Sequence, residues 1–498
     1  MLFSSYIFIF AFLPASLLGF FILSSRPGGE RWAKAWLGMV SLVYYGWWNP
    51  VYVGLIAVSM LFNFGLGKVI WRVRADPVRG GALMGLGVAA NLALLCYYKY
   101  ANFFVDTLGG WLGTGWHVEK LILPLGISFF TFQQVAYLVD ARRGVACEGK
   151  LVEFVLFITF FPHSIAGPIV HHTEMMPQFA RPATYRFRWE NQAVGLTLFA
   201  LGLFKKVIIA DGLSGHAGTV FGAAAAGQGL HASDAWAGVL SYTFQIYFDF
   251  SGYSDMALGL GRMFGIVLPL NFNSPYKAVD LIDFWRRWHI TLSRFLRDYI
   301  YIPLGGNRHG PMRRYLNLLL TMLLGGLWHG AGWTFLAWGA LHGLGLALNH
   351  LMLARWPTMA AAGPGREATR WIGRILTLLL VTIGWVFFRA SHLPAASHLL
   401  GAMLGLGPAL DPGAAVLLKS KLWFWLAGLL ALVWFTPNAC ELTREAYPAL
   451  LAKGHHLDAP PGWLQWRPQS GWAFATALLL AVAILSLTNA GEFLYYNF

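Results

Sequence analysis

Apolar runs of roughly 17 to 25 residues recur along this chain, and they constrain its fold more than any other feature. A helix needs about 20 predominantly apolar residues to cross a hydrocarbon core about 30 Å thick. Of the 498 residues, 57% are hydrophobic and only 12% are charged, whereas soluble proteins carry about 25% charged residues. We therefore expect an all-α integral membrane protein with many membrane helices.

The predicted membrane segments follow one another closely and number about eleven to thirteen, re-entrant helices included. The first lie near residues 4–24, 32–50, 51–71, 81–98 and 121–139. The later ones lie near residues 151–170, 191–210, 236–264, 314–354 (interrupted), 371–389, 395–410, 421–437 and 471–489. Positive charge follows the first segment and then alternates between links, so the positive-inside rule places the N-terminus outside. The sidedness of 171–190 stays open, because its arginines favour the cytoplasm whereas the count of spans favours the outside; 151–170 would then be a re-entrant pair.

Composition limits the other classes of function. Lys and Arg number 36 against 22 Asp and Glu, and a membrane protein uses such an excess in its cytoplasmic loops, so we expect no nucleic acid partner. The three cysteines have no metal-type spacing. No link is long enough for a second folded domain; residues 215–234, for example, read as an Ala/Gly-rich loop. We expect one membrane domain over 1–498, with a motif-bearing core at 120–350 between N-terminal helices (1–119) and C-terminal helices (351–498).

Two histidines in the stretch 247–343 are the candidates for chemistry, because an ionisable residue at membrane depth is by default a functional hypothesis. A helix starting at Arg314 would carry His329 about 22 Å from the charged boundary, beyond the bilayer midplane. Glycines follow His329, and a helix broken at that depth must face protein or a water-filled cavity. The alternative is that Gly326 and Gly330 form a helix-packing face and His329 only hydrogen-bonds a neighbouring helix.

His289 belongs to a segment that we predict as one amphipathic helix over 280–301. Its polar stripe would hold Arg286, His289, Ser293 and Arg297. So much charge excludes a lipid-facing crossing, so the helix would lie at the cytoplasmic interface or dip into a protein-lined cavity. The alternative is an interfacial anchor helix with an incidental histidine.

Other polar residues of this stretch are weaker candidates. Asp249 and Asp255 would point in different directions from one helix, Asp255 together with Ser251, and either could neutralise an arginine or orient a histidine. His342 should lie away from His329 unless the glycine break folds the chain back. His171 has no carboxylate or cysteine at ligand spacing, so we expect no metal site.

Five motifs carry a family resemblance and follow one another in order. They are LPLGISFFTFQQVAYLVDARRG (122–144), FFPHSIAGPI (160–169), FDFSGYSDMALGLG (248–261), FNSPYKAVDLIDFWRRWHITLSRFLRDYIYIPLGGNR (272–308) and GGLWHGAGWTFLAWGALHG (325–343). With them the chain closely resembles the membrane-bound O-acyltransferase family, above all the bacterial branch that acetylates exported polysaccharides such as alginate.

The resemblance implies a helical basin in the bacterial inner membrane whose thin floor separates a cytoplasmic donor from an external acceptor. It implies that His329 is catalytic and that His289 is the second essential histidine. The expected donor is acetyl-CoA, with its phosphates near Arg286, Arg287, Arg294 or Arg297, and no permanently bound cofactor. The expected partners are membrane lipids, a periplasmic acetyl-handling protein and a polysaccharide acceptor. Further substrate-binding candidates are Ser293, Asp249, Ser251, Asp255 and Trp328.

Two other functions remain open at this point. One is transfer of D-alanine from a carrier-protein thioester to teichoic acid, which stays within the family. The other is a transporter or polysaccharide channel, which also needs polar residues in a membrane cavity.

Overall fold

The computed structural model describes residues 1–114, 121–147, 149–356, 367–406, 421–446, 457–487, 491 and 493–494, and the regular elements in these ranges are all helices. Five helical segments there are long and apolar enough to cross a membrane: Val51–Arg72, Pro77–Leu112, Trp189–Ala225, Trp333–Arg355 and Glu367–Arg389. Shorter apolar helices cover Phe8–Ser24, Lys421–Phe435 and Ser470–Leu485. The all-α membrane fold is therefore confirmed, whereas eleven to thirteen segments stays a prediction.

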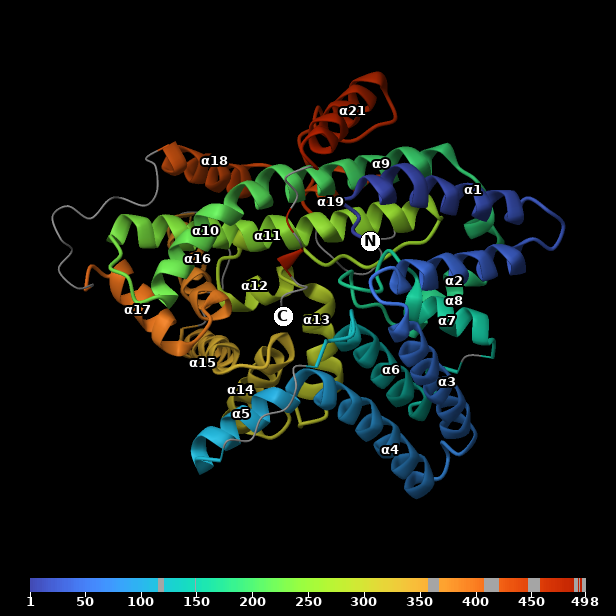
Figure 1. Cartoon of the computed structure of the whole chain (residues 1–498), viewed down its shortest axis with the longest axis horizontal. Coiled ribbons are helices and arrows are strands. Elements are labelled where there is room, and N and C mark those ends of the chain that lie inside the picture. The colour runs from blue at the N-terminus through green and yellow to red at the C-terminus, as the bar shows by residue number, and fades with distance from the viewer. Residues whose placement is uncertain are drawn as a thin grey trace.

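Along the sequence, the helices of the first half of the chain can be divided into two groups, and Figure 1 shows these groups packed against each other. The N-terminal group comprises η1 (Phe8–Phe12), α1 (Leu13–Ser24), α2 (Glu30–Gly46), α3 (Val51–Arg72), α4 (Pro77–Leu95), the π-turn η2 (Cys96–Tyr100) and α5 (Ala101–Leu112). The second comprises α6 (Ile127–Arg142), α7 (Leu151–Thr159), α8 (His172–Phe179), η3 (Pro182–Tyr185), α9 (Trp189–Phe204), η4 (Lys205–Ala210), α10 (Asp211–Ala225) and α11 (Ala232–Met263).

The second half begins with the elements that carry the candidate site. They are η5 (Pro275–Lys277), α12 (Leu281–Arg287), α13 (Ile290–Leu296), η6 (Arg297–Tyr301), α14 (Gly310–His329) and α15 (Trp333–Arg355). The remaining described helices are α16 (Glu367–Arg389), α17 (Leu393–Met403), α18 (Lys421–Phe435), α19 (Ala439–Leu442) and α21 (Ser470–Leu485).

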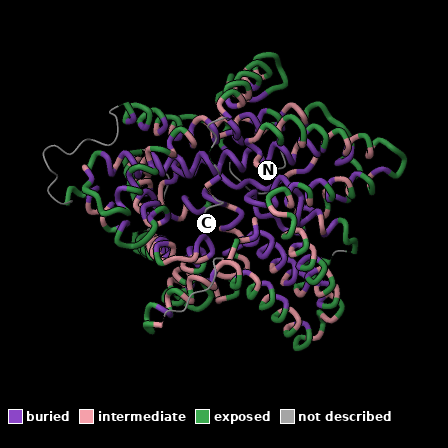
Figure 2. The backbone as a smooth tube through the Cα atoms, viewed as in Figure 1, coloured by how far each residue is buried: buried purple, intermediate pink, exposed green. Residues whose placement is uncertain are grey.

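α11 is the central helix and is buried along nearly its whole length, as the buried trace through the middle of Figure 2 illustrates. α9 lies along it at very short range (Figure 1). Gly195 and Gly202 of α9 oppose Gly259 and Gly252 of α11, and a Cβ on any of the four would collide with the other helix. Small residues permit such close approach of membrane helices, so these glycines set the distance between α9 and α11.

Two predicted segments differ from the structure. α7 ends at Thr159 and is too short to cross, so the span at 151–170 is wrong; Pro162 and Pro168 prevent a longer helix there. The prediction of a loop over 215–234 is also wrong in its first half, because α10 continues to Ala225. The alanines of this segment favour a helix. The ends of the segments predicted at 395–410 and 471–489 lie outside the described residues.

Candidate active site

His329 lies where α14 ends and the chain turns back on itself. α15 begins only four residues later, at Trp333, and packs along α14. Gly330 has an extended backbone, and a Cβ at this position would collide with the ring of Phe335. The interruption predicted within 314–354 is therefore confirmed, and it places His329 at the buried C-terminal end of α14.

The imidazole of His329 lines a small aromatic cavity. The residue is only 5% exposed, and its ring centre lies 5.2 Å from that of Trp338 and 5.1 Å from that of Phe388. The cavity measures about 20 Å³, enough for one water molecule. Its lining consists of Ile246, Asp249, Phe250, Trp288, His329, Trp338, Trp385, Phe388, Phe493 and Leu494.

His289 lies at a break between two short helices, so the continuous helix predicted over 280–301 is wrong. α12 ends at Arg287 and α13 begins at Ile290, with His289 in the left-handed region at φ 41° and ψ 54°. This conformation is rare for a residue other than glycine and costs about 1–3 kcal/mol. The N–H of Ile290 donates to the carbonyl of Asn271 instead of continuing a helix. As a result His289 leaves the predicted arginine stripe and is completely buried.

Asn271 fixes which nitrogen of His289 carries a proton. Its side-chain Oδ1 lies 3.0 Å from Nδ1 of His289 and also accepts hydrogen bonds from the backbone N–H and the hydroxyl of Thr291. A backbone N–H can only donate, so this amide atom is the acceptor oxygen, and Nδ1 of His289 must be the donor. In the neutral ring the lone pair is then on Nε2.

The two imidazoles lie close together. Their ring centres are 6.5 Å apart, which is too far for a direct hydrogen bond between ring nitrogens. The structure thus brings together the two histidines that the sequence singled out. His289 lies between α12 and α13, and His329 lies between α14 and α15.

Asp249 also lines the cavity but is engaged in an ion pair. It lies 2.8 Å from Nζ of Lys206, which lies 2.6 Å from Asp211. The N–H of Leu494 donates to its other oxygen at 3.1 Å. Asp249 therefore neutralises a lysine and holds the segment that contributes Phe493 and Leu494 to the cavity wall.

Asp255 and Ser251 lie on the same helix but not at the cavity. Asp255 pairs with Lys205 at 2.6 Å, so Asp249 and Asp255 bind consecutive lysines of η4. The hydroxyl of Ser251 is buried and has no hydrogen-bond partner among the described residues. The predicted difference in direction between Asp249 and Asp255 is confirmed, although their partners are lysines rather than arginines.

Of the four arginines expected near the donor phosphates, Arg287 and Arg297 are already paired. Arg287 lies 2.8 Å from Asp283 and Arg297 lies 2.6 Å from Asp298. Arg286 is exposed. Of this set, Arg286 is the best placed to meet a phosphate from solution.

Ser293 and Trp328 occupy supporting positions. The hydroxyl of Ser293 donates to the carbonyl of Trp288 at 3.4 Å. Trp328 is buried, stacks on Phe132 at 5.0 Å and lies edge-on to the ring of His329. Trp328 therefore fixes one side of the His329 ring.

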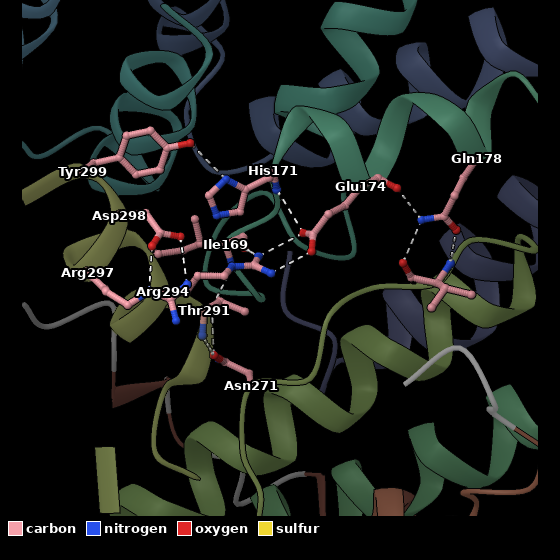
Figure 3. A network of polar contacts seen from close by, with 11 residues as sticks. Ile169, His171, Glu174, Gln178, Asn271, Thr291, Arg294, Arg297, Asp298 and Tyr299 are labelled. Atoms are coloured by element: carbon pink, nitrogen blue, oxygen red, sulfur yellow. Dashed lines mark hydrogen bonds and ion pairs between the residues drawn. The ribbon is translucent and has the colours of Figure 1, made fainter. Parts of the chain in front are cut away.

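A polar network on the other side of α13 ties the site to α8 and α6 (Figure 3). Arg294 makes a bidentate ion pair with Glu174 at 2.7 and 3.0 Å, and Glu174 also accepts the N–H of His171. The hydroxyl of Tyr299 lies 3.2 Å from Nδ1 of His171 and donates to Asp140 at 2.8 Å. Arg294 is thus engaged within the protein, which removes it from the arginines expected to meet phosphates.

The glycine break does fold the chain back, and this brings His342 near the site. Trp338 lies between the two rings, 5.2 Å from His329 and 4.8 Å from His342. Nδ1 of His342 accepts a hydrogen bond from the indole N–H of Trp285. His342 therefore supports the cavity wall from behind.

Sequence reasoning missed several residues that hold the site. Asn271, Glu174 and Lys206 lie in other segments and are joined to the site only by the fold. Lys99 did carry a signal, since it is an ionisable residue at the end of the apolar run 81–98.

Among the described residues, no group of three His, Cys, Asp or Glu side chains is arranged to hold a metal ion.

Comparison with known proteins agrees with this arrangement of motifs. The sequence profile of the membrane-bound O-acyltransferase family matches residues 125–391, more than half of the chain and all of the site except the C-terminal segment. This chain belongs to the membrane-bound O-acyltransferase family. The protein is therefore an acyltransferase and a polytopic membrane protein.

Curated relatives of this acyltransferase include proteins that match it over the full length. It is 43% identical to a probable alginate O-acetylase of Pseudomonas aeruginosa, with 100% of both chains covered. It is 42% identical to a peptidoglycan O-acetyltransferase of Helicobacter pylori over 82% of this chain and 80% of the relative. A teichoic acid D-alanyltransferase of Streptococcus thermophilus is 29% identical over 54% of this chain and 69% of its own length.

Proposed function

We propose that this acyltransferase moves an acetyl group from a cytoplasmic thioester, acetyl-CoA, across the bacterial inner membrane for O-acetylation of an exported polysaccharide such as alginate. The acetyl group would pass to the polymer directly or through a periplasmic acetyl-handling protein. The observation that carries the proposal is the position of His329 at a cavity, 6.5 Å from His289. The full-length similarity to probable alginate O-acetylases supports the choice of acceptor. The proposed orientation has the N-terminus in the periplasm.

His329 acts as the general base in this proposal. Its neutral imidazole takes the proton of the acceptor hydroxyl while the hydroxyl oxygen attacks the thioester carbonyl carbon. The C–S bond then breaks, and the departing thiolate takes the proton back from the imidazolium. A buried site favours this cycle, because burial disfavours a lasting charge on the ring.

His289 orients the reacting hydroxyl. Since Nδ1 donates to Asn271, the neutral ring offers only the lone pair of Nε2, which can accept a hydrogen bond but cannot donate one to a carbonyl. Accepting a hydrogen bond from the reacting hydroxyl therefore fits His289 better than contact with the thioester carbonyl.

Trp338 is the best-placed donor for the developing oxyanion. Acyl transfer needs a preorganised hydrogen-bond donor at the carbonyl oxygen. The indole N–H of Trp338 is buried and has no acceptor among the described residues, and its ring lines the cavity next to His329. Donation from this N–H to the oxyanion would complete the set of groups that the reaction requires.

The second candidate function is D-alanyl transfer from a carrier protein, which the similarity to teichoic acid D-alanyltransferases supports. Identity to these proteins is lower and covers less of the chain than identity to the O-acetylases. Nothing in the fold favours a transporter, because the chain belongs to an acyltransferase family.

The donor assay distinguishes the two transferases. The purified protein, reconstituted in lipid nanodiscs with alginate and teichoic acid present as acceptors, is given either acetyl-CoA or a carrier protein charged with D-alanine, and release of the free thiol is followed. We expect thiol release from acetyl-CoA and none above background from the charged carrier. Thiol release from the charged carrier alone would contradict the proposal.

A further inference from the structure

A lysine at membrane depth binds the end of the helix that carries His329. Lys99 belongs to the π-turn η2, within the apolar segment Pro77–Leu112. Its Nζ lies 2.6 Å from the carbonyl oxygen of Trp328 and 3.1 Å from that of His329. It also lies 3.4 Å from the hydroxyl of Ser128. An ammonium group in this position needs several acceptors, because it has left water.

The neighbouring residue binds the same helix end. The hydroxyl of Tyr100 donates to the carbonyl of Leu327 at 2.9 Å, and Tyr100 is 94% buried, with 6% of its surface exposed. The side chains of two consecutive residues thus meet three consecutive carbonyls, those of Leu327, Trp328 and His329. π-turns inside helices occur frequently at functional sites.

These three carbonyls follow the last hydrogen bond of the α14 ladder, which the N–H of Gly330 donates to Gly326. The final carbonyls of a helix need partners from outside it, and a cation is favoured there by the helix dipole. Because His329 is the last residue of α14, whatever holds these carbonyls also sets the direction of its side chain.

We propose that Lys99, assisted by Tyr100, is a positioning residue for acyl transfer: it holds the last turn of α14 so that the His329 ring stays at the cavity. The proposal rests on the proposed role of His329 as base. The hydrogen bonds of Lys99 to α14 all go to backbone oxygens, and its Nζ also lies 5.9 Å from the ring centre of Trp328, the residue before His329. Its contribution is therefore to the geometry of the base and not to donor binding.

The test compares Lys99→Met with Lys68→Met in nanodiscs, using acetyl-CoA as the donor. Lys68 also donates to a backbone carbonyl, that of Gly149, but it lies on α3 and this hydrogen bond is exposed. For Lys99→Met we expect kcat to fall about 10²-fold with little change in KM for acetyl-CoA, since a misplaced catalytic group costs about that much. Lys68→Met keeps wild-type kcat.

Two further variants separate positioning from folding. Lys99→Arg retains donors for both carbonyls, and its kcat should be about tenfold higher than that of Lys99→Met. Tyr100→Phe, which keeps the ring, should lower kcat several-fold, with Tyr52→Phe as its control because Tyr52 also donates to a carbonyl.

If Lys99→Met is not recovered folded, Tyr100→Phe decides the question alone. Wild-type kcat in Lys99→Met or in Tyr100→Phe, or a loss confined to KM, would overturn the proposal. If His329→Ala remains active as well, the proposed function fails; if only Lys99→Met remains active, this inference alone fails.

Discussion

The ring centres of His289 and His329 lie 6.5 Å apart, and each residue lies at a break between two helices. His289 adopts a left-handed backbone conformation and hydrogen-bonds Asn271, while His329 ends α14 beside two glycines. Irregular backbone at membrane depth is tolerated only where it is buried in protein or lines a cavity. The two breaks therefore bring the two imidazoles close to each other inside the protein.

Asn271→Leu should remove the acceptor that fixes the protonated nitrogen of His289. The ring could then carry its proton on either nitrogen, and we expect kcat to fall about 10²-fold, the lower range of a general acid–base contribution. Thr291→Val is the matched control, because it removes another donor to the same oxygen but leaves the bond to His289. Equal activity of both variants would contradict the role assigned to Asn271.

Trp338→Phe should remove the proposed oxyanion donor while keeping most of the aromatic wall. Loss of one such donor costs about 10²–10³-fold in kcat. Trp236→Phe is the control, since the indole of Trp236 donates to the carbonyl of Met403 at a distant position. A Trp338→Phe enzyme with wild-type kcat in the thiol-release assay would show that the oxyanion is stabilised by another group.

The sequence predicted the fold class, the helix interruption after His329 and the motifs that belong to the family. These features could be predicted because they depend on the charge and the apolar length of single segments. It did not predict the break at His289, because the bonds that interrupt the helix come from Asn271, in a segment outside it. Nor did it predict that Arg294 pairs with Glu174 or that Lys99 reaches α14, since helical periodicity gives a direction but no partner.

Lys206→Met should destabilise the protein strongly. Lys206 is 3% exposed, and its removal leaves the carboxylates of Asp211 and Asp249 buried without their cation. Breaking a buried ion pair in this way costs about 3–5 kcal/mol. The control is Lys150→Met, because Lys150 is largely exposed and its contact with Glu153 is long, at 3.5 Å. Thermal unfolding in detergent measures the stability of both variants. A Lys206→Met protein as stable as Lys150→Met would show that the two carboxylates are accommodated without the lysine.

The most direct test of the account is the replacement of His329 by alanine, with the polymer O-acetyl content measured in cells that contain equal amounts of the membrane protein. His342→Ala is the control, because His342 lies behind Trp338 and outside the cavity lining. We predict that His329→Ala lowers O-acetylation to background, whereas His342→Ala retains most of it. O-acetylation near the wild-type level in His329→Ala would contradict the assignment of His329 as the base.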